Sequence, residues 1–223
     1  NFRFQKIFRR LREILDSGEI GTPTFARLSW RNDIDVYSNQ PYLLSTERFM
    51  IMDVGIHMLD LARFLVGDAT AVSCLNQSVK EGLAGEDAAT LLLRGAEGAT
   101  AIVDVSYAAH RNPNPFPQTF GEIEGRRGTV QILDGGVLRV HGPHETRDEV
   151  ILPDGRDWTA PPWTQIQDSV PRTQQHFVDA LRAGRPFETS ATDSLQTYAL
   201  AEAAYRSAAS GRLVEIAPLL EET

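Results

Sequence analysis

The sequence predicts an α+β fold, in which a large, mostly antiparallel open sheet carries its helices on one face. Apolar residues recur at helical spacing near both ends of the 223-residue chain, whereas the middle of the chain alternates with a period of two. Short glycine-containing turns such as RGAEGA and LDGGVL separate the alternating segments. Strands joined by such tight turns run antiparallel, so the chain consists of helices, then a long meander, then helices.

The chain begins with a helix that leads into a strand. Apolar residues at helical spacing run from Ile7 to Leu15, and Gly18 provides a stop. Thr24–Arg31 alternates apolar and polar residues, which predicts a half-buried strand. Asn32–Thr46 is a polar loop, long enough to predict a lid or a pocket wall.

A second helix is predicted around the stretch MDVGIHMLD, from Met52 to Asp60. Its flanks are apolar nearly all round, and a helix of that kind is normally buried. Ser45 or Thr46 supplies a candidate start and Gly67 a candidate stop.

Seven strand candidates follow, interrupted by the proline-containing stretch HRNPNPFPQ, whose three prolines do not all fit inside a ladder. They are Ala71–Val79, Ala88–Arg94, Thr100–Ala108, Thr119–Glu124, Thr129–Leu133, Val137–His141 and Glu149–Leu152. Strands such as TLLL and AIVDV are apolar on both sides. We therefore expect the uncovered sheet face to pair with another subunit.

The end of the chain returns to helix after a second irregular stretch, Pro153–Pro171. One helix is predicted over Thr173–Ala183, which Gly184 ends. Another is predicted over Thr192–Ser210, where Ser190 to Asp193 resembles a capping box. Leu213–Ile216 is a candidate edge strand.

Composition excludes several classes of partner. A net charge of −8 and a pI near 5.1 argue against a surface for nucleic acid or anionic membranes. No apolar run approaches the ~20 residues of a membrane span, and the start does not read as a signal peptide. A single cysteine, Cys74, is consistent with a reducing compartment, so we expect a cytoplasmic protein.

Three polar residues interrupt the apolar second helix. Because each helical residue advances ~100°, Asp53, His57 and Asp60 return to one stripe. Burying an unpartnered charge is costly, so the stripe forms either a satisfied structural network or the wall of a wet pocket. Two ligands four apart also suit zinc, but the neighbouring Glu base of zinc proteases and a second His–Cys pair at finger spacing are absent, so we expect no metal.

The order of these motifs resembles the C-terminal, substrate-binding part of the NAD(P)-dependent glucose–fructose oxidoreductase and inositol dehydrogenase family (Gfo/Idh/MocA). The matching pieces cover essentially the whole chain. They are NFRFQ with the following helix and SGEIGTP, a strand ending in SWR, DVGIHMLDLARFLVG, EDAATLLL, GEIEGRRGTVQI, and HFVDALRAGRPFETSATDSLQTYALAEAAYRSA.

The resemblance implies a dihydrodipicolinate-reductase-like C-terminal fold and assigns roles to the stripe. Asp53 and His57 would face the nicotinamide and bind substrate hydroxyls, with His57 as the general acid or base. Oxidising a secondary alcohol requires removal of an O–H proton, and histidine titrates near neutrality. Asp60 would support them, and Asn1 and Arg3 would lie beside the nicotinamide pocket.

Two departures from the family pattern matter. RFMIM replaces the glycine-rich step before the Asp, which predicts a bulkier pocket near Phe49 and Met50. The family also begins with a Rossmann domain carrying G-x-G-x-x-G and a catalytic lysine, whereas the stretch Gly121–Gly128 fails that spacing. We therefore expect residues 1–20 to be a linking helix left from the nucleotide-binding domain and residues 21–223 to be the substrate-binding and oligomerisation domain.

Three functions remain open at this stage. The preferred one is the substrate-binding half of a bacterial NAD- or NADP-dependent oxidoreductase acting on a sugar, inositol or related polyol, assembled as a homodimer or homotetramer through the sheet face. The second is a noncatalytic binding or assembly module of the same fold. The third is a metal-dependent hydrolase or isomerase that uses Asp53 and His57 with His110, His141 or His144.

Overall fold

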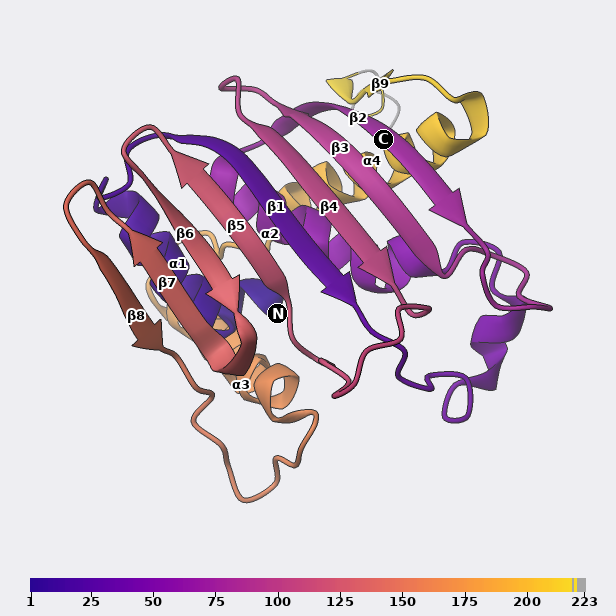
Figure 1. Cartoon of the computed structure of the whole chain (residues 1–223), viewed down its shortest axis with the longest axis horizontal. Coiled ribbons are helices and arrows are strands. Elements are labelled where there is room, and N and C mark those ends of the chain that lie inside the picture. The colour runs from indigo at the N-terminus through magenta and orange to yellow at the C-terminus, as the bar shows by residue number, and fades with distance from the viewer. Residues whose placement is uncertain (218, 220–223) are drawn as a thin grey trace.

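The computed structural model describes residues 1–217 and residue 219, which form one layer of helices against one large sheet (Figure 1). The helical elements are η1 (Phe2–Phe4), α1 (Lys6–Asp16), η2 (Pro41–Ser45), η3 (Ile51–Gly55), α2 (Ile56–Val66), η4 (Asp134–Gly136), α3 (Thr164–Arg182) and α4 (Ala191–Ser210). The strands are β1 (Pro23–Arg31), β2 (Ala69–Gln77), β3 (Ala88–Gly95), β4 (Thr100–Ser106), β5 (Phe120–Gly125), β6 (Gly128–Leu133), β7 (Val137–His141), β8 (Thr146–Val150) and β9 (Val214–Glu215).

The sheet consists of two antiparallel meanders joined by β1. The strand order is β8-β7-β6-β5-β1-β4-β3-β2-β9, and among these strands only β1 and β4 run parallel. Arg27 of β1 pairs with Ile102 of β4 on one side and with Glu122 of β5 on the other. The predicted α+β architecture with a mostly antiparallel open sheet is confirmed.

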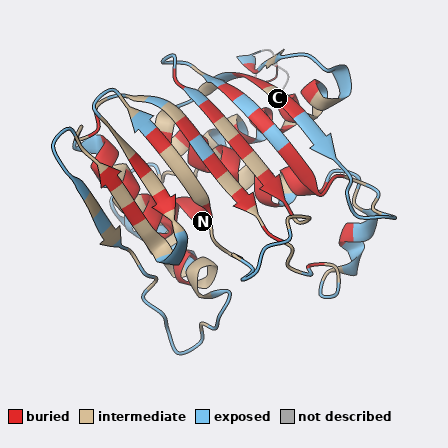
Figure 2. Cartoon of the chain, viewed as in Figure 1, coloured by how far each residue is buried: buried red, intermediate tan, exposed pale blue. Residues whose placement is uncertain are grey.

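The core lies between the sheet and the helices, which occupy the far side of the sheet in the view of Figure 1. Every second residue of the central strands is buried, as Figure 2 shows. In β1 the buried set is Ala26, Leu28 and Trp30, each at most 2% exposed. This period-two burial fixes the register, because a slip by one residue would turn every apolar side chain to the solvent.

The second helix starts later than the sequence predicts. Residues 41–45 form a separate short helix, and the continuous helical segment begins with a π-helical turn, η3, before α2. Neither Ser45 nor Thr46 caps it. The buried Glu86 does so instead, because its backbone oxygen accepts from Met50 N and its side chain accepts from Ile51 N at 3.0 Å. The predicted end is confirmed, since Gly67 adopts a φ of +93° directly after Val66.

Two other predicted boundaries are wrong. Helix α3 begins at Thr164, not Thr173, and contains Pro171. A proline removes its own N–H and its ring crowds the carbonyl four residues earlier, so the sequence placed the start of the helix after Pro171. The bond from Gln167 N to Trp163 O shows that the helix is already formed before Pro171. Strand β8 covers Thr146–Val150, whereas the apolar pattern predicted 149–152, because ion pairs such as Arg139–Asp148 hold it against β7.

The opposite sheet face combines apolar and charged residues. Leu75 and Leu92 are 73% and 47% exposed, while Asp104 accepts from Ser29 and lies near Arg31 on the same face. Among the described residues, no helix is long and apolar enough to cross a membrane.

Candidate functional site

His57 lies near the start of α2 and packs against the N-terminal residues. Its ring stacks on Phe2, with the ring centroids 4.5 Å apart and the planes 11° from parallel. Neither ring nitrogen is hydrogen-bonded to a described residue. Burial lowers the pKa of His57 to about 4, so the imidazole is neutral near pH 7. A neutral imidazole with a free nitrogen is a proton acceptor.

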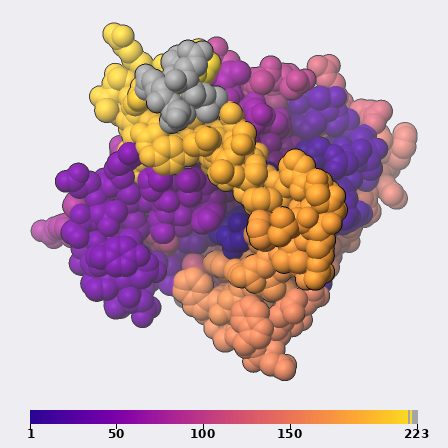
Figure 3. Space-filling view, turned by 180° about the vertical axis from the view of Figure 1, so that it is seen from behind, coloured from indigo at the N-terminus to yellow at the C-terminus, as the bar shows by residue number. Residues whose placement is uncertain are grey.

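The N-terminal residues lie on the helix side of the molecule. In Figure 3 the darkest indigo residues of the N-terminus show at the centre of this face, between the purple segment and the orange α3. Asn1 is fixed there by a hydrogen bond from its Nδ2 to Ser169 Oγ of α3, at 2.8 Å. The structure therefore places Asn1 next to the His57–Phe2 stack, at the junction with α3.

Asp53 projects from the π-helical turn and remains open to solvent on one side. The Tyr107 hydroxyl donates to its Oδ2 at 2.7 Å. Crowding by protein on the other side raises the pKa of Asp53, and the Tyr107 hydrogen bond opposes that rise. The result is a carboxylate held in one orientation, with one oxygen available to a further hydroxyl donor.

Tyr107 is a functional candidate that sequence reasoning missed. Its ring lies edge-on to Trp30 at 5.2 Å and parallel to Phe49 at 5.6 Å. These contacts lock the ring, and burial raises its pKa well above the usual range, so the hydroxyl stays a donor. It follows directly after β4, where strand ends commonly carry site residues, but nothing in the sequence pairs it with Asp53.

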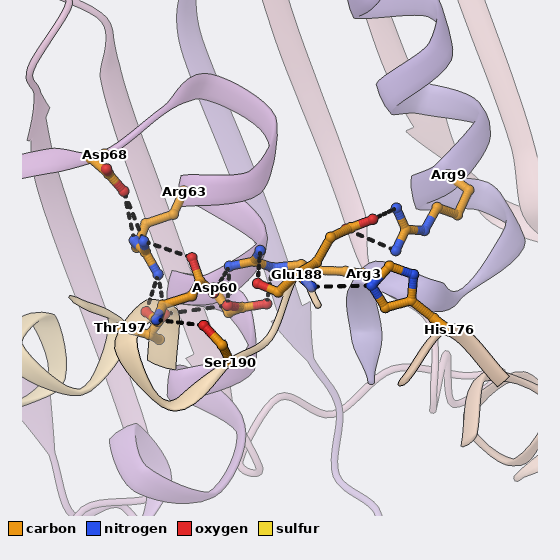
Figure 4. A network of polar contacts seen from close by, with 10 residues as sticks. Arg3, Arg9, Asp60, Arg63, Asp68, His176, Glu188, Ser190 and Thr197 are labelled. Atoms are coloured by element: carbon orange, nitrogen blue, oxygen red, sulfur yellow. Dashed lines mark hydrogen bonds and ion pairs between the residues drawn. The ribbon is translucent and has the colours of Figure 1, made fainter. Parts of the chain in front are cut away.

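Asp60, the third member of the predicted stripe, belongs to a different environment. It receives Arg3 Nε on Oδ2 at 2.7 Å and Arg3 Nη2 on Oδ1 at 2.6 Å, and Thr197 Oγ1 donates to it at 3.2 Å (Figure 4). Arg3 is 6% exposed and also contacts Asp193 at 2.8 Å. The guanidinium that was expected beside the nicotinamide is thus engaged in a buried ion-pair network.

That network extends across the helices behind the site (Figure 4). Arg63 of α2 donates to Thr197 at 2.7 Å and pairs with Asp68 at 2.9 Å and with Asp193 at 3.1 Å. Arg9 of α1 pairs with Glu188, whose backbone N–H donates to His176 Nε2. The network joins η1, α1, α2 and both C-terminal helices, so it fixes the segment that carries Phe2.

The stripe is therefore divided between two environments. No hydrogen bond joins Asp53, His57 and Asp60 to one another; each contacts a different partner, respectively Tyr107, Phe2 and Arg3. The structural-network interpretation requires each residue of the stripe to be satisfied by polar partners inside the core. It describes Asp60 well and the other two residues poorly.

The metal interpretation receives no support from the described residues. Among residues 1–217 and 219, no group of three His, Cys, Asp or Glu side chains is arranged to hold a metal ion. His110 contacts Asp33 at 2.7 Å, and His141 contacts Thr146 and Gln131.

Comparison with known proteins gives a consistent result. The family model of the GFO/IDH/MocA C-terminal domain matches residues 8–131. D-apiose dehydrogenase from Rhizobium rhizogenes is 45% identical over 99% of the chain, which covers 64% of that protein. Inositol 2-dehydrogenase from Rhizobium meliloti is 28% identical over 97% of the chain, again covering 64% of that protein.

Solved structures show the same relationship. An oxidoreductase from Agrobacterium radiobacter, in complex with NAD+, L-tartaric acid and magnesium, superposes with a TM-score of 0.96 at 44% identity, covering 98% of this chain and 64% of that one. Levoglucosan dehydrogenase, in complex with NADH and levoglucosan, has a TM-score of 0.79 at 19% identity over 96% and 64% of the two chains, which shows the shared fold. The chain thus spans less than two thirds of the length of these relatives. On the family model, the relatives and the fold together, the chain belongs to the GFO/IDH/MocA C-terminal domain family.

Proposed function

We propose that this chain is the substrate-binding part of an NAD(P)-dependent oxidoreductase acting on a sugar, inositol or related polyol. The observation that carries the proposal is the half-buried, neutral His57 with its free ring nitrogen, near an Asp53 oriented by Tyr107. The relatives named as apiose and inositol dehydrogenases support the substrate class. Residues 21–223 would form the substrate-binding and oligomerisation domain, and residues 1–20 the linking helix.

His57 moves the proton in this reaction. When a substrate alcohol is oxidised, its O–H proton passes to the free imidazole nitrogen, and in the reverse direction the imidazolium returns it. The lowered pKa keeps the accepting form populated at neutral pH and favours release of the proton to solvent afterwards. Phe2 holds the ring plane and excludes water from one of its faces.

Asp53 orients the substrate beside that base. Its free oxygen accepts a hydrogen bond from a second substrate hydroxyl, and Tyr107 keeps the carboxylate from rotating. A sugar or polyol carries hydroxyl groups on adjacent carbons. One hydroxyl can give its proton to His57 while its neighbour donates a hydrogen bond to Asp53 on the same helical segment. Charge-assisted hydrogen bonds of this kind are the stronger ones in proteins.

His57 and Asp53 suit the neighbourhood of the nicotinamide ring of NAD or NADP, whereas the described residues offer no binding site for the cofactor's phosphates. When bound, the nicotinamide accepts or donates the hydride. The glycines at Gly121–Gly128 lie on the β5–β6 hairpin and not at a strand-to-helix turn, so they make no phosphate cradle. We infer that the described residues supply the substrate wall, and that they alone bind the dinucleotide weakly.

The decisive experiment is His57→Gln in the protein that carries this chain. Turnover with NAD or NADP should fall by roughly 10²–10⁴ across a panel containing D-apiose, myo-inositol and other polyols. The thermal midpoint should change little, because the ring nitrogens make no hydrogen bond. Near-wild-type turnover in His57→Gln, or no dehydrogenase activity in the wild type, would instead favour a noncatalytic binding module.

We also propose a cytoplasmic homodimer or homotetramer that pairs through the open sheet face. The exposed Leu75 and Leu92 and the half-buried Ile102 supply apolar contact area there. Light scattering should give a mass of two or four chains, and Leu92→Glu should reduce it. A monodisperse wild-type monomer at micromolar concentration would contradict this assembly.

A further inference from the structure

Residues 84–87 lead into β3 and run alongside the chain that leads into η3. At Gly85 the two stretches of backbone come so close that a Cβ atom would collide with the backbone oxygens of Thr46 and Glu47. A glycine is therefore required there, because it alone lacks that atom. The close approach brings the next residue, Glu86, to the first turn of η3.

Glu86 fixes the start of η3 with its backbone and with its side chain. Its backbone oxygen accepts from Met50 N and its Oε1 accepts from Ile51 N, each at 3.0 Å. Such N–H groups lie in the first turn of a helical segment, where partners within the helix are missing. Asp53 follows two residues later, and its own N–H donates to Phe49 O at 2.8 Å. The place of the Asp53 backbone therefore depends on the contacts that Glu86 makes.

The neighbouring Asp87 fixes Tyr107, and together the two acidic residues open the stretch EDAATLLL. The Tyr107 N–H donates to Asp87 O at 2.9 Å, which extends the pairing of β3 with β4 by one residue. Asp87 is 1% exposed, and its carboxylate accepts from Val79 N at 2.7 Å and from Lys80 N at 3.0 Å. Two adjacent residues thus hold the two partners of the Asp53–Tyr107 hydrogen bond, one residue for each partner.

Tyr205 of α4 holds the side chain of Glu86 in place. Its hydroxyl donates to Glu86 Oε1 at 2.6 Å, to the same oxygen that accepts from Ile51 N. The Arg48 guanidinium carbon lies 4.2 Å from the centre of the Tyr205 ring, and Arg48 pairs with Glu202 of the same helix at 2.6 Å. Burial raises the pKa of Tyr205, so its hydroxyl remains a donor near neutral pH. The Glu86 carboxylate therefore has one orientation, which α4 determines.

We propose that Glu86 is a positioning residue, held by Tyr205, that keeps the Asp53 carboxylate at the Tyr107 hydroxyl. Glu86 acts through the backbone of η3 and touches no substrate. The effect on substrate binding rests on the proposed function, whereas the dependence of the 2.7 Å Asp53–Tyr107 contact on Glu86 does not. A cap that served stability alone would lower the free energy of unfolding and leave the binding of a substrate hydroxyl unchanged.

Four variants of the protein that carries this chain separate these roles. Glu86→Leu removes the acceptor oxygen at nearly the same side-chain size, whereas Glu86→Gln keeps an oxygen for both donors. Tyr205→Phe removes only the hydroxyl that holds Glu86, and it still tests the proposal should Glu86→Leu fail to fold. Tyr198→Phe is the matched control, because Tyr198 lies on the same helix, is 38% exposed and hydrogen-bonds Glu202 instead of Glu86.

The first measurement is steady-state kinetics per folded molecule with the polyol panel. KM should rise about 10- to 100-fold in Glu86→Leu and up to about tenfold in Tyr205→Phe, with kcat less affected. Glu86→Gln and Tyr198→Phe should stay near the wild type. In a Tyr107→Phe background, Glu86→Leu should raise KM little further, because the contact that it preserves is already absent. Fully additive effects, or an unchanged KM in both Glu86→Leu and Tyr205→Phe, would overturn the proposal.

The second measurement is the crystal structure of Glu86→Leu and of Tyr205→Phe. The Tyr107 hydroxyl and Asp53 Oδ2 should move beyond hydrogen-bonding distance in Glu86→Leu and remain in contact in Glu86→Gln. This measurement decides the proposal even if the wild type shows no dehydrogenase activity, a result that would count against the proposed function alone. An Asp53–Tyr107 contact that stays at 2.7 Å in both Glu86→Leu and Tyr205→Phe would show that Glu86 does not position it.

Discussion

Asp53 and Asp60 lie on the same helical segment, yet one is open and the other is fully paired. Asp53 has a single protein partner, the Tyr107 hydroxyl, and faces solvent on its other side. Asp60 receives two hydrogen bonds from Arg3 and one from Thr197. The difference teaches that equal spacing on one helix does not give equal roles, because the partners come from other elements.

The largest expected effect is on stability, from a substitution of the fully paired Asp60. Asp60→Asn leaves the buried Arg3 with a weakened partner, and breaking a buried ion pair costs about 3–5 kcal/mol. We therefore expect a large drop in the free energy of unfolding, measured by urea denaturation, with turnover per folded molecule nearly unchanged. Asp53→Asn should show the opposite pattern, a small stability change and a large loss of kcat/KM. If both variants lose the same property, the two carboxylates are not functionally distinct.

The second prediction concerns how the free energy of unfolding depends on pH through His57. Burial lowers the pKa of His57 to about 4, below the ordinary 6.5, so the unfolded chain binds the extra proton first as pH falls. The stabilising contribution is present above pH ~6.5 and is lost as pH falls toward about 4, by about 1–3 kcal/mol. The denaturation curves of wild type and His57→Gln should nearly coincide near pH 7 and separate as pH falls, because only the wild type loses this contribution. Parallel curves would mean that His57 titrates normally in the folded protein.

The smallest expected effect concerns Tyr107. Tyr107→Phe keeps the ring between Trp30 and Phe49 but removes the hydrogen bond to Asp53. A hydrogen bond to a charged group contributes about 1.5–3 kcal/mol when both partners are buried, and less at this open carboxylate. We expect KM for the polyol to rise up to about tenfold, with kcat less affected and the thermal midpoint nearly constant. A fall in kcat at constant KM would place the phenol in proton transfer instead of in orientation.

Local rules predicted most of the fold. The period-two segments and glycine turns gave β2 to β7 within a few residues, and the Ser190 cap formed as expected, with its side chain accepting from Asp193 N. Gly184, with a φ of +62°, ends α3 where the sequence placed the stop. The start of the second helix could not be found this way, because its cap, Glu86, comes from a segment that is distant in the sequence.

The candidate site was predictable only in part, for the same reason. The motif containing Asp53 and His57 drew attention to both residues, whereas Phe2 and Tyr107 become their neighbours only after the chain has folded. Arg63 was overlooked within an apolar helix, although a buried cation there requires carboxylates such as Asp193. Spacing predicts which side chains share a helix face, and tertiary contacts determine what each one meets.

The central position of β1 has a consequence for how the chain folds. The strands β2 to β4 and β5 to β8 each pair with their sequence neighbours, so both meanders can form early from local contacts. Arg27 of β1, by contrast, must find Ile102 and Glu122, and the entropy of closing those long loops is lost before any pairing is gained. We therefore expect the pairing of β1 with β4 and β5 to form late in folding, and an unpaired strand edge at either position would favour aggregation.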